Sequence, residues 1–117
     1  MPLSLVVDDE PAIRTYITTI LRGEDFQVLE AESGVQALQI VEELRGGLDL
    51  IVSDIQMPNG DGLSLANAVK NSFPAVSVVL ISGNVSPDAS FDVIAKPFSP
   101  GVLLQAVRGV IARVTQD

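Results

Sequence analysis

The chain has 117 residues, 47% apolar and only 4% aromatic, which corresponds to one globular domain with an aliphatic core. It contains no cysteine and no histidine, which excludes disulfide bonds, thiol nucleophiles and the commonest general base and transition-metal ligand. The net charge of −8 disfavours nucleic acid and anionic membrane surfaces as direct partners.

Two kinds of apolar pattern alternate along the chain. Short apolar runs predict strands at residues 3–7, 27–30, 49–53, 76–81 and 93–95. Apolar residues at helical spacing predict helices that begin near Pro11, Ser33, Leu63 and Pro100. Strands that alternate with helices in this way indicate an α/β fold, in which a parallel sheet is covered by helices on both faces.

No feature of the sequence divides the chain. It has no internal repeat, low-complexity segment or linker, so we expect residues 1–117 to form one domain. The longest apolar run is too short to cross a bilayer, and Met1-Pro2-Leu3 leads directly into the first expected strand. We therefore expect a cytoplasmic domain without a signal peptide.

The connection between the fourth and fifth expected strands is short. Only the nine residues from Gly83 to Phe91 separate Ser82 from Asp92, whereas a parallel crossover needs about 10–12 residues including its helix. Their Gly, Asn, Ser and Pro content is typical of a turn. We expect at most one helical turn in this segment, and therefore four full helices in the chain.

Polar residues lie at the carboxyl ends of the expected strands, where open α/β sheets bind ligands. They are Asp8, Asp9 and Glu10 after the first strand, Asp54 after the third, Ser82 after the fourth and Lys96 after the fifth. Converging carboxylates raise one another's pKa, and a hard divalent cation such as Mg²⁺ relieves their repulsion. A lysine beside them supplies charge for an anionic group. The sequence predicts an acidic Mg²⁺ pocket in which Asp54 acts as a nucleophile toward a phosphoryl group.

Each of these residues also has an ordinary interpretation. The acidic run at residues 8–10 alone would be an exposed helix start stabilised by the helix dipole. Ser82 alone would be a strand-end hydroxyl, and Lys96 alone a solvated surface lysine. Gln56 and Asn84 would be polar loop residues. For Asp8, Asp9, Ser82 and Lys96 the functional interpretation is favoured, because the expected parallel sheet brings them to one edge beside Asp54.

Four motifs of this sequence resemble those of response-regulator receiver domains of two-component signalling. They are Val6-Val7-Asp8-Asp9-Glu10-Pro11, Asp54-Ile55-Gln56-Met57-Pro58 with Asp61-Gly62, Leu80-Ile81-Ser82-Gly83 and Lys96-Pro97-Phe98. Each lies at the end of an expected strand, and the resemblance covers essentially the full chain. It implies a doubly wound, flavodoxin-like sheet of five parallel strands in the order 2-1-3-4-5. Because the connection before Asp92 is short, we expect the family's fourth helix to be shortened or absent here.

The resemblance implies the identity of the nucleophile and of the metal ligands. Asp54 would be the phosphoacceptor, charged from the phosphohistidine of a sensor histidine kinase or phosphotransfer protein. Mg²⁺ would be bound by the carboxylates of Asp9 and Asp54, by the backbone carbonyl of Gln56, and by Asp8 through a water molecule. Such a domain is a signalling phosphoacceptor that catalyses only its own phosphorylation and dephosphorylation.

The resemblance also implies which groups surround the phosphate. Ser82 would be the switch hydroxyl that turns toward it, and Lys96 would pair with Asp54 before phosphorylation and with the phosphate afterwards. Gly83 would leave the phosphate open to donors and water, and Asn84 would tune dephosphorylation together with Gln56. The family implies a cis peptide bond between Lys96 and Pro97.

The sequence departs from the family pattern in two places. The residues missing before Asp92 are those of the family's fourth helix, and Val93 replaces the usual switch aromatic. Phe91, two residues earlier on the same expected strand face, is a candidate replacement. The route from the phosphate to an effector domain or downstream protein is therefore a separate question from phosphorylation.

Three other classes of protein are weighed against this interpretation. A haloacid dehalogenase phosphatase also uses an aspartate after a strand, but it needs a second aspartate where this chain has Gln56. A nucleotide-binding domain is disfavoured because both glycine-rich phosphate-binding motifs are absent. The remaining alternative is a pseudo-receiver, a protein-binding module that is not switched by phosphorylation. Its expected mark is the loss of an acidic pocket residue or of Lys96.

Overall fold

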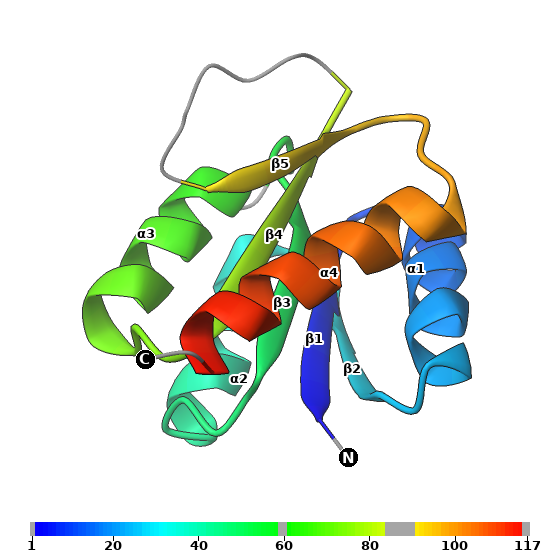
Figure 1. Cartoon of the computed structure of the whole chain (residues 1–117). Coiled ribbons are helices and arrows are strands. Elements are labelled where there is room, and N and C mark those ends of the chain that lie inside the picture. The colour runs from blue at the N-terminus through cyan, green and yellow to red at the C-terminus, as the bar shows by residue number, and fades with distance from the viewer. Residues whose placement is uncertain (1, 59–60, 84–90, 116–117) are drawn as a thin grey trace.

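The computed structural model describes residues 2–58, 61–83 and 91–115, and within these ranges four helices alternate with five strands (Figure 1). The strands are β1 (Leu3–Val7), β2 (Gln27–Ala31), β3 (Leu50–Asp54), β4 (Ser77–Ser82) and β5 (Asp92–Ala95). The helices are α1 (Pro11–Gly23), α2 (Gly34–Glu43), α3 (Gly62–Ser72) and α4 (Pro100–Thr115).

All five strands are parallel and lie in the order β2-β1-β3-β4-β5, which confirms the predicted doubly wound topology. Helices α1 and α4 cover one face of the sheet, and α2 and α3 cover the other (Figure 1). The order reverses between β1 and β3, since β2 lies outside β1 and β4 lies outside β3. In open α/β sheets, this is the point at which ligands bind.

The alternation of side chains along each strand divides the core into two layers. On β3, Ile51 packs with α2 and α3, whereas Leu50 and Val52 pack with α1 and α4. All five residues of β3 are buried. This explains why the central strand reads as a continuous apolar run and not as an alternating one.

Two of the helix starts are fixed by the polar residues that precede them. The Ser33 hydroxyl accepts a hydrogen bond from the backbone N–H of Gln36 at 3.1 Å, and the Asp61 carboxylate accepts one from Ser64 at 2.7 Å. These caps satisfy donors in the first turns of α2 and α3. Ser33 and Asp61 are thus the N-cap residues of α2 and α3.

Three strands end one residue later than the sequence pattern predicted: β2 at Ala31, β3 at Asp54 and β4 at Ser82. Asp54 is the last residue of β3 because it pairs with Ile81, and Ser82 is the last residue of β4 because it pairs with Ala95. A polar residue ends an apolar run in the sequence, but the ladder to the neighbouring strand continues through it. Both side chains are therefore held by strand geometry and not by loop geometry.

The connection between β4 and β5 includes residues 84–90, which lie outside the described residues, together with the prediction of a shortened helix there. The four full helices predicted elsewhere are all present, and α4 is the C-terminal one. The Lys96–Pro97 peptide bond is cis, as the resemblance implied. Among the helices of the described ranges, none is long and apolar enough to cross a bilayer.

Candidate functional site

Three aspartates meet at the point where the strand order reverses. Asp8 follows β1, Asp9 is the next residue, and Asp54 ends β3; one carboxylate oxygen of each lies within 4.8 Å of the others. Asp8 is 0% and Asp54 5% exposed, whereas Asp9 faces solvent. The sequence predicted this convergence, but Glu10, which it included in the acidic group, is the N-cap residue of α1 and lies outside the cluster.

Lys96 places a positive charge against the two buried carboxylates. Its Nζ lies 3.4 Å from Asp54 Oδ1 and 3.9 Å from Asp8 Oδ2. The backbone N–H of Lys96 donates to the carbonyl of Ser82 at 2.8 Å, so the hydrogen bonds between β4 and β5 continue one residue beyond β5. This bond fixes the backbone position from which the Lys96 side chain extends. The structure thus brings Lys96 to Asp54, as predicted.

Burial governs the ionisation of the two inner carboxyl groups. Desolvation raises the pKa of Asp54, and the charge and hydrogen bond of Lys96 oppose this effect, as does a backbone hydrogen bond from Gln56. Desolvation also raises the pKa of Asp8, against a backbone hydrogen bond from Glu10. One ammonium group does not compensate for the burial of both carboxylates.

The donor set of the cluster fits a hard divalent cation. Asp8 Oδ1 accepts a hydrogen bond from the backbone N–H of Glu10 at 2.9 Å, but among the described residues no hydrogen-bond donor reaches the buried Oδ2. A buried carboxylate oxygen without a donor is costly, and a cation or its bound water supplies the missing partner. Carboxylate oxygens are the ligands that Mg²⁺ prefers, and the exposed Asp9 leaves the cluster open to solvent.

The turn after Asp54 is held close to the site by a glycine. A Cβ added to Gly62 would overlap the carbonyl oxygen of Asp54, and the Gly62 N–H donates to the Ile55 carbonyl at 2.9 Å. The Ser53 hydroxyl donates to the same Asp54 carbonyl at 2.9 Å. The sequence pattern did not show that α3 begins in contact with the Asp54 backbone.

The remaining predicted residues surround this cluster. Ser82, 3% exposed, ends β4 beside the strand of Asp54, and Gly83 follows it; among the described residues, no atom lies within 4 Å of a Cβ built on Gly83. Gln56 is exposed in the loop after β3. Asn84 lies outside the described residues. All the pocket residues whose loss would mark a pseudo-receiver are present.

Three side-chain contacts of this region, two made by Arg14 and one by Phe91, were not predicted. Arg14 of α1 donates to the carbonyl of Asp8 at 2.8 Å and pairs with Glu30 at 3.1 Å. The only sequence signal for the Arg14 contacts was the position of this basic residue, one helical turn after the acidic run at residues 8–10. Phe91, just before β5, has Lys70 of α3 at 5.4 Å from its ring centroid, within cation–π range.

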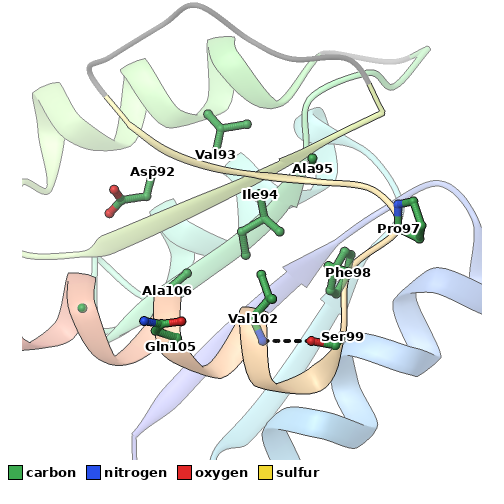
Figure 2. Close-up of a pocket in the computed structure, with 11 residues that line it drawn as sticks. Asp92, Val93, Ile94, Ala95, Pro97, Phe98, Ser99, Val102, Gln105 and Ala106 are labelled. Atoms are coloured by element: carbon green, nitrogen blue, oxygen red, sulfur yellow. Dashed lines mark hydrogen bonds between the residues drawn. The ribbon is translucent and has the colours of Figure 1, made fainter.

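A separate apolar hollow of about 560 Å³ lies between β5 and α4 (Figure 2). Ile94 points from β5 toward Val102 and Ala106 of α4, while Val93 points to the opposite side of the strand. Phe98, after the cis bond, forms one wall. The lining includes Asp92 but not Asp8, Asp9 or Asp54, so this hollow and the acidic cluster occupy different places on the domain.

Comparison with known proteins agrees with the site. A model of the response regulator receiver domain matches residues 4–108. The chain is 36% identical to the sensor kinase CckA of Brucella abortus, over 93% of this chain and 12% of that protein. It is 33% identical to the heme response regulator HssR of Staphylococcus aureus, over 93% of this chain and 51% of that protein. The chain thus spans about half or less of these relatives.

Solved structures show the same fold. A receiver domain protein from Clostridium thermocellum superposes with a TM-score of 0.89 at 26% identity and covers 99% of this chain and 98% of its own. The receiver domain of the hybrid histidine kinase CckA superposes with a TM-score of 0.81 at 33% identity, covering 93% of this chain and 98% of its own. The chain belongs to the response regulator receiver domain family of two-component signalling.

Proposed function

We propose that Asp54 accepts a phosphoryl group from the phosphohistidine of a sensor histidine kinase or phosphotransfer protein, in a Mg²⁺-dependent reaction within a cytoplasmic domain that spans residues 1–117. One observation carries the proposal: the buried Asp54 carboxylate has Lys96 Nζ at 3.4 Å and lies in a cluster with Asp8 and Asp9. The carboxylate nucleophile lies between the Lys96 ammonium group and a cluster that can bind Mg²⁺. Two positive charges on either side of the nucleophile suit the transfer of a negatively charged phosphoryl group.

Four residues are assigned to the metal. Asp9 and Asp54 would bind Mg²⁺ through their carboxylates, Gln56 through its backbone carbonyl, and Asp8 through a water molecule. When bound, Mg²⁺ neutralises charge on the carboxylates and on the phosphoryl oxygens. Two observations support this assignment: no hydrogen-bond donor of the described residues reaches Asp8 Oδ2, and the Asp54 carboxylate is desolvated.

Asp54 supplies the nucleophile. One of its carboxylate oxygens forms a bond to phosphorus while the P–N bond of the phosphohistidine breaks, and the electron pair of that bond returns to the donor imidazole. Lys96 pairs first with Asp54 and then with the phosphoryl oxygens. The Ser82 hydroxyl turns to donate to a phosphoryl oxygen, and Gly83 leaves the space beside it open.

Phosphorylation then serves as the signal. Receiver domains are phosphoacceptors and not classical enzymes, and the proposal is that this one catalyses only its own phosphorylation and dephosphorylation. Gln56 and Asn84 are assigned to tuning the hydrolysis of the aspartyl phosphate. The altered conformation is read by an effector domain or a downstream protein, and the net charge of −8 disfavours direct contact with nucleic acid or membrane.

The proposal is tested by intact-mass measurement after incubation with Mg²⁺ and a small-molecule phosphodonor such as acetyl phosphate. The wild-type chain is expected to gain one phosphoryl group, and neither the Asp54→Ala variant nor a sample with excess chelator is expected to gain it. An Asp61→Ala variant is the matched control, because Asp61 is a helix cap outside the cluster. A gain that persists in Asp54→Ala would contradict the assignment of the nucleophile.

A further inference from the structure

Arg14 connects the acidic cluster to the neighbouring strand β2. Its Nη1 donates to the backbone carbonyl of Asp8 at 2.8 Å, and its Nε donates to Glu30 Oε1 at 3.1 Å. Glu30 lies on β2 opposite Val6 of β1, so the guanidinium group bridges α1, β2 and the loop after β1. With 19% of its side chain exposed, Arg14 is more enclosed than an ordinary surface arginine.

Asp8 is held at three points. Its N–H donates to the Ala31 carbonyl at 3.1 Å, its Oδ1 accepts from the Glu10 N–H at 2.9 Å, and its carbonyl accepts from Arg14. The carbonyl belongs to the peptide that joins Asp8 to Asp9. The Arg14 hydrogen bond therefore acts directly on that peptide, whereas the other two bonds are made by groups on either side of it.

The plane of this peptide sets the direction of the next side chain. Asp9 is exposed, so packing does not fix its carboxylate, and its position in the cluster depends on its backbone. We propose that Arg14, oriented by Glu30, is a positioning residue that holds the Asp8–Asp9 peptide in the geometry in which the three aspartates bind Mg²⁺. This inference rests on the metal assignment of the proposed function.

A positioning role of Arg14 and a simple effect of its charge predict opposite changes in the affinity for Mg²⁺ when Arg14 is replaced. Arg14 is a positive charge near the aspartates, so its removal would strengthen cation binding if charge alone mattered. If Arg14 positions Asp9, its removal weakens cation binding, as with other partners that orient metal ligands. A lysine does not replace it fully, because one ammonium group lacks the planar fork that meets a carbonyl and a carboxylate together.

The test is isothermal titration calorimetry of the metal-free protein with MgCl₂. It measures the Kd for Mg²⁺ without any phosphorylation. We expect Arg14→Met to raise the Kd for Mg²⁺ by about tenfold, and Arg14→Lys to lie between this variant and wild type. The matched control is Arg108→Met, which removes the same charge from an exposed pair with Glu24 at 3.4 Å and is expected to leave the Kd within about twofold.

A second pair of variants probes Glu30. Glu30→Gln is expected to weaken binding more than Glu24→Gln, which carries the same charge change, and to have no further effect in the Arg14→Met background. Thermal melts without metal establish that each variant is folded; if Arg14→Met does not fold, the Glu30→Gln and Glu24→Gln comparison decides. Binding by Arg14→Met that is as tight as that of Arg108→Met, or tighter, would overturn the inference.

The metal assignment has its own readout in this experiment. If wild type does not bind Mg²⁺, or if Asp9→Asn binds it equally well, the metal site of the proposed function is wrong, and the role of Arg14 is overturned with it. If wild type binds and Asp9→Asn does not, the metal site stands. The Arg14 variants then decide the positioning role alone.

Discussion

Lys96 Nζ lies 3.4 Å from Asp54 Oδ1, although the two residues belong to the ends of different strands with β4 between them. Strand geometry fixes both, because Asp54 is the last residue of β3 and the Lys96 N–H continues the ladder of β4 and β5. Since the carboxyl ends of parallel strands share one edge of the sheet, the fold brings the cation to the nucleophile.

Removal of the Lys96 charge is expected to slow phosphorylation of Asp54. Lys96→Met takes away the fixed cation that meets the incoming phosphoryl oxygens, and a loss of about 10²-fold in the rate with a small-molecule donor is expected. The rate is measured by intact mass against time. The chain's other lysine, Lys70 on α3, offers the control: Lys70→Met is expected to keep the wild-type rate. Equal rates for the two variants would contradict the role given to Lys96.

The stability of the metal-free protein is expected to fall as the pH rises above about 4. Burial raises the pKa of Asp8 and Asp54 above the ordinary value of 3.8, so the folded state holds protons at pH values where the unfolded chain has lost them. The stabilisation that these two carboxyl groups contribute to the folded state is therefore fully present below pH 3.8. It is lost as the pH rises through their pKa values in the folded state.

Asp8→Asn isolates this effect. The amide keeps an acceptor for the Glu10 N–H and removes one buried charge, so the variant is expected to melt roughly 4 °C above wild type at pH 7 in the presence of a chelator. The difference should shrink toward pH 4. A thermal melt at each pH, followed by circular dichroism, measures it. A variant less stable than wild type at pH 7 would show that the Asp8 charge is already compensated without metal.

Mg²⁺ is expected to stabilise the folded domain through Asp9. A ligand that binds only the folded state at 100 times its Kd adds about 2.7 kcal/mol, so the melting temperature of wild type should rise with added MgCl₂. Asp9→Asn should abolish the rise, while Glu10→Gln, an identical charge change at the next position but outside the cluster, should keep it. An equal loss in both variants would indicate general charge screening in place of a site.

Gly62→Ala is expected to disturb the nucleophile through the backbone. The added methyl group would overlap the Asp54 carbonyl, so α3 or the end of β3 must shift, at a cost of about 1–3 kcal/mol of unfolding free energy. Gly109→Ala on α4 is the control. Apart from the neighbouring backbone of its own helix, no atom of the described residues lies within 4 Å of its added Cβ, and alanine favours the helix. Denaturant unfolding measures both, and equal stability of the two variants would contradict the close approach.

The layered sheet and the location of the site could be predicted from the sequence because they depend on local patterns. Apolar runs gave the strands, helical spacing gave the helices, and parallel topology alone placed Asp8, Asp54 and Lys96 at one edge. The strand ends were one residue short at Asp54 and Ser82 because pairing with a neighbouring strand, which continues through a polar residue, has no signature within the strand itself.

The contacts of Arg14, Gly62 and Phe91 could not be predicted for a related reason. Each joins elements whose relative position is set only when the helices pack, such as Arg14 of α1 with Glu30 of β2. Sequence spacing also did not show that Asp8 is fully buried while the adjacent Asp9 is exposed. Because of that difference, the Asp8 carboxylate is desolvated, whereas the Asp9 carboxylate leaves the site open to a cation from solvent.

The most direct test of the account is to locate the phosphoryl group chemically. The protein is phosphorylated with a small-molecule donor and Mg²⁺ and reduced with borohydride, which converts an aspartyl phosphate to homoserine, and its peptides are then sequenced by mass spectrometry. We expect homoserine at position 54 only, and none when Mg²⁺ is chelated. Homoserine at Asp8 or Asp9, or phosphate on a serine or threonine with Asp54 unchanged, would contradict it.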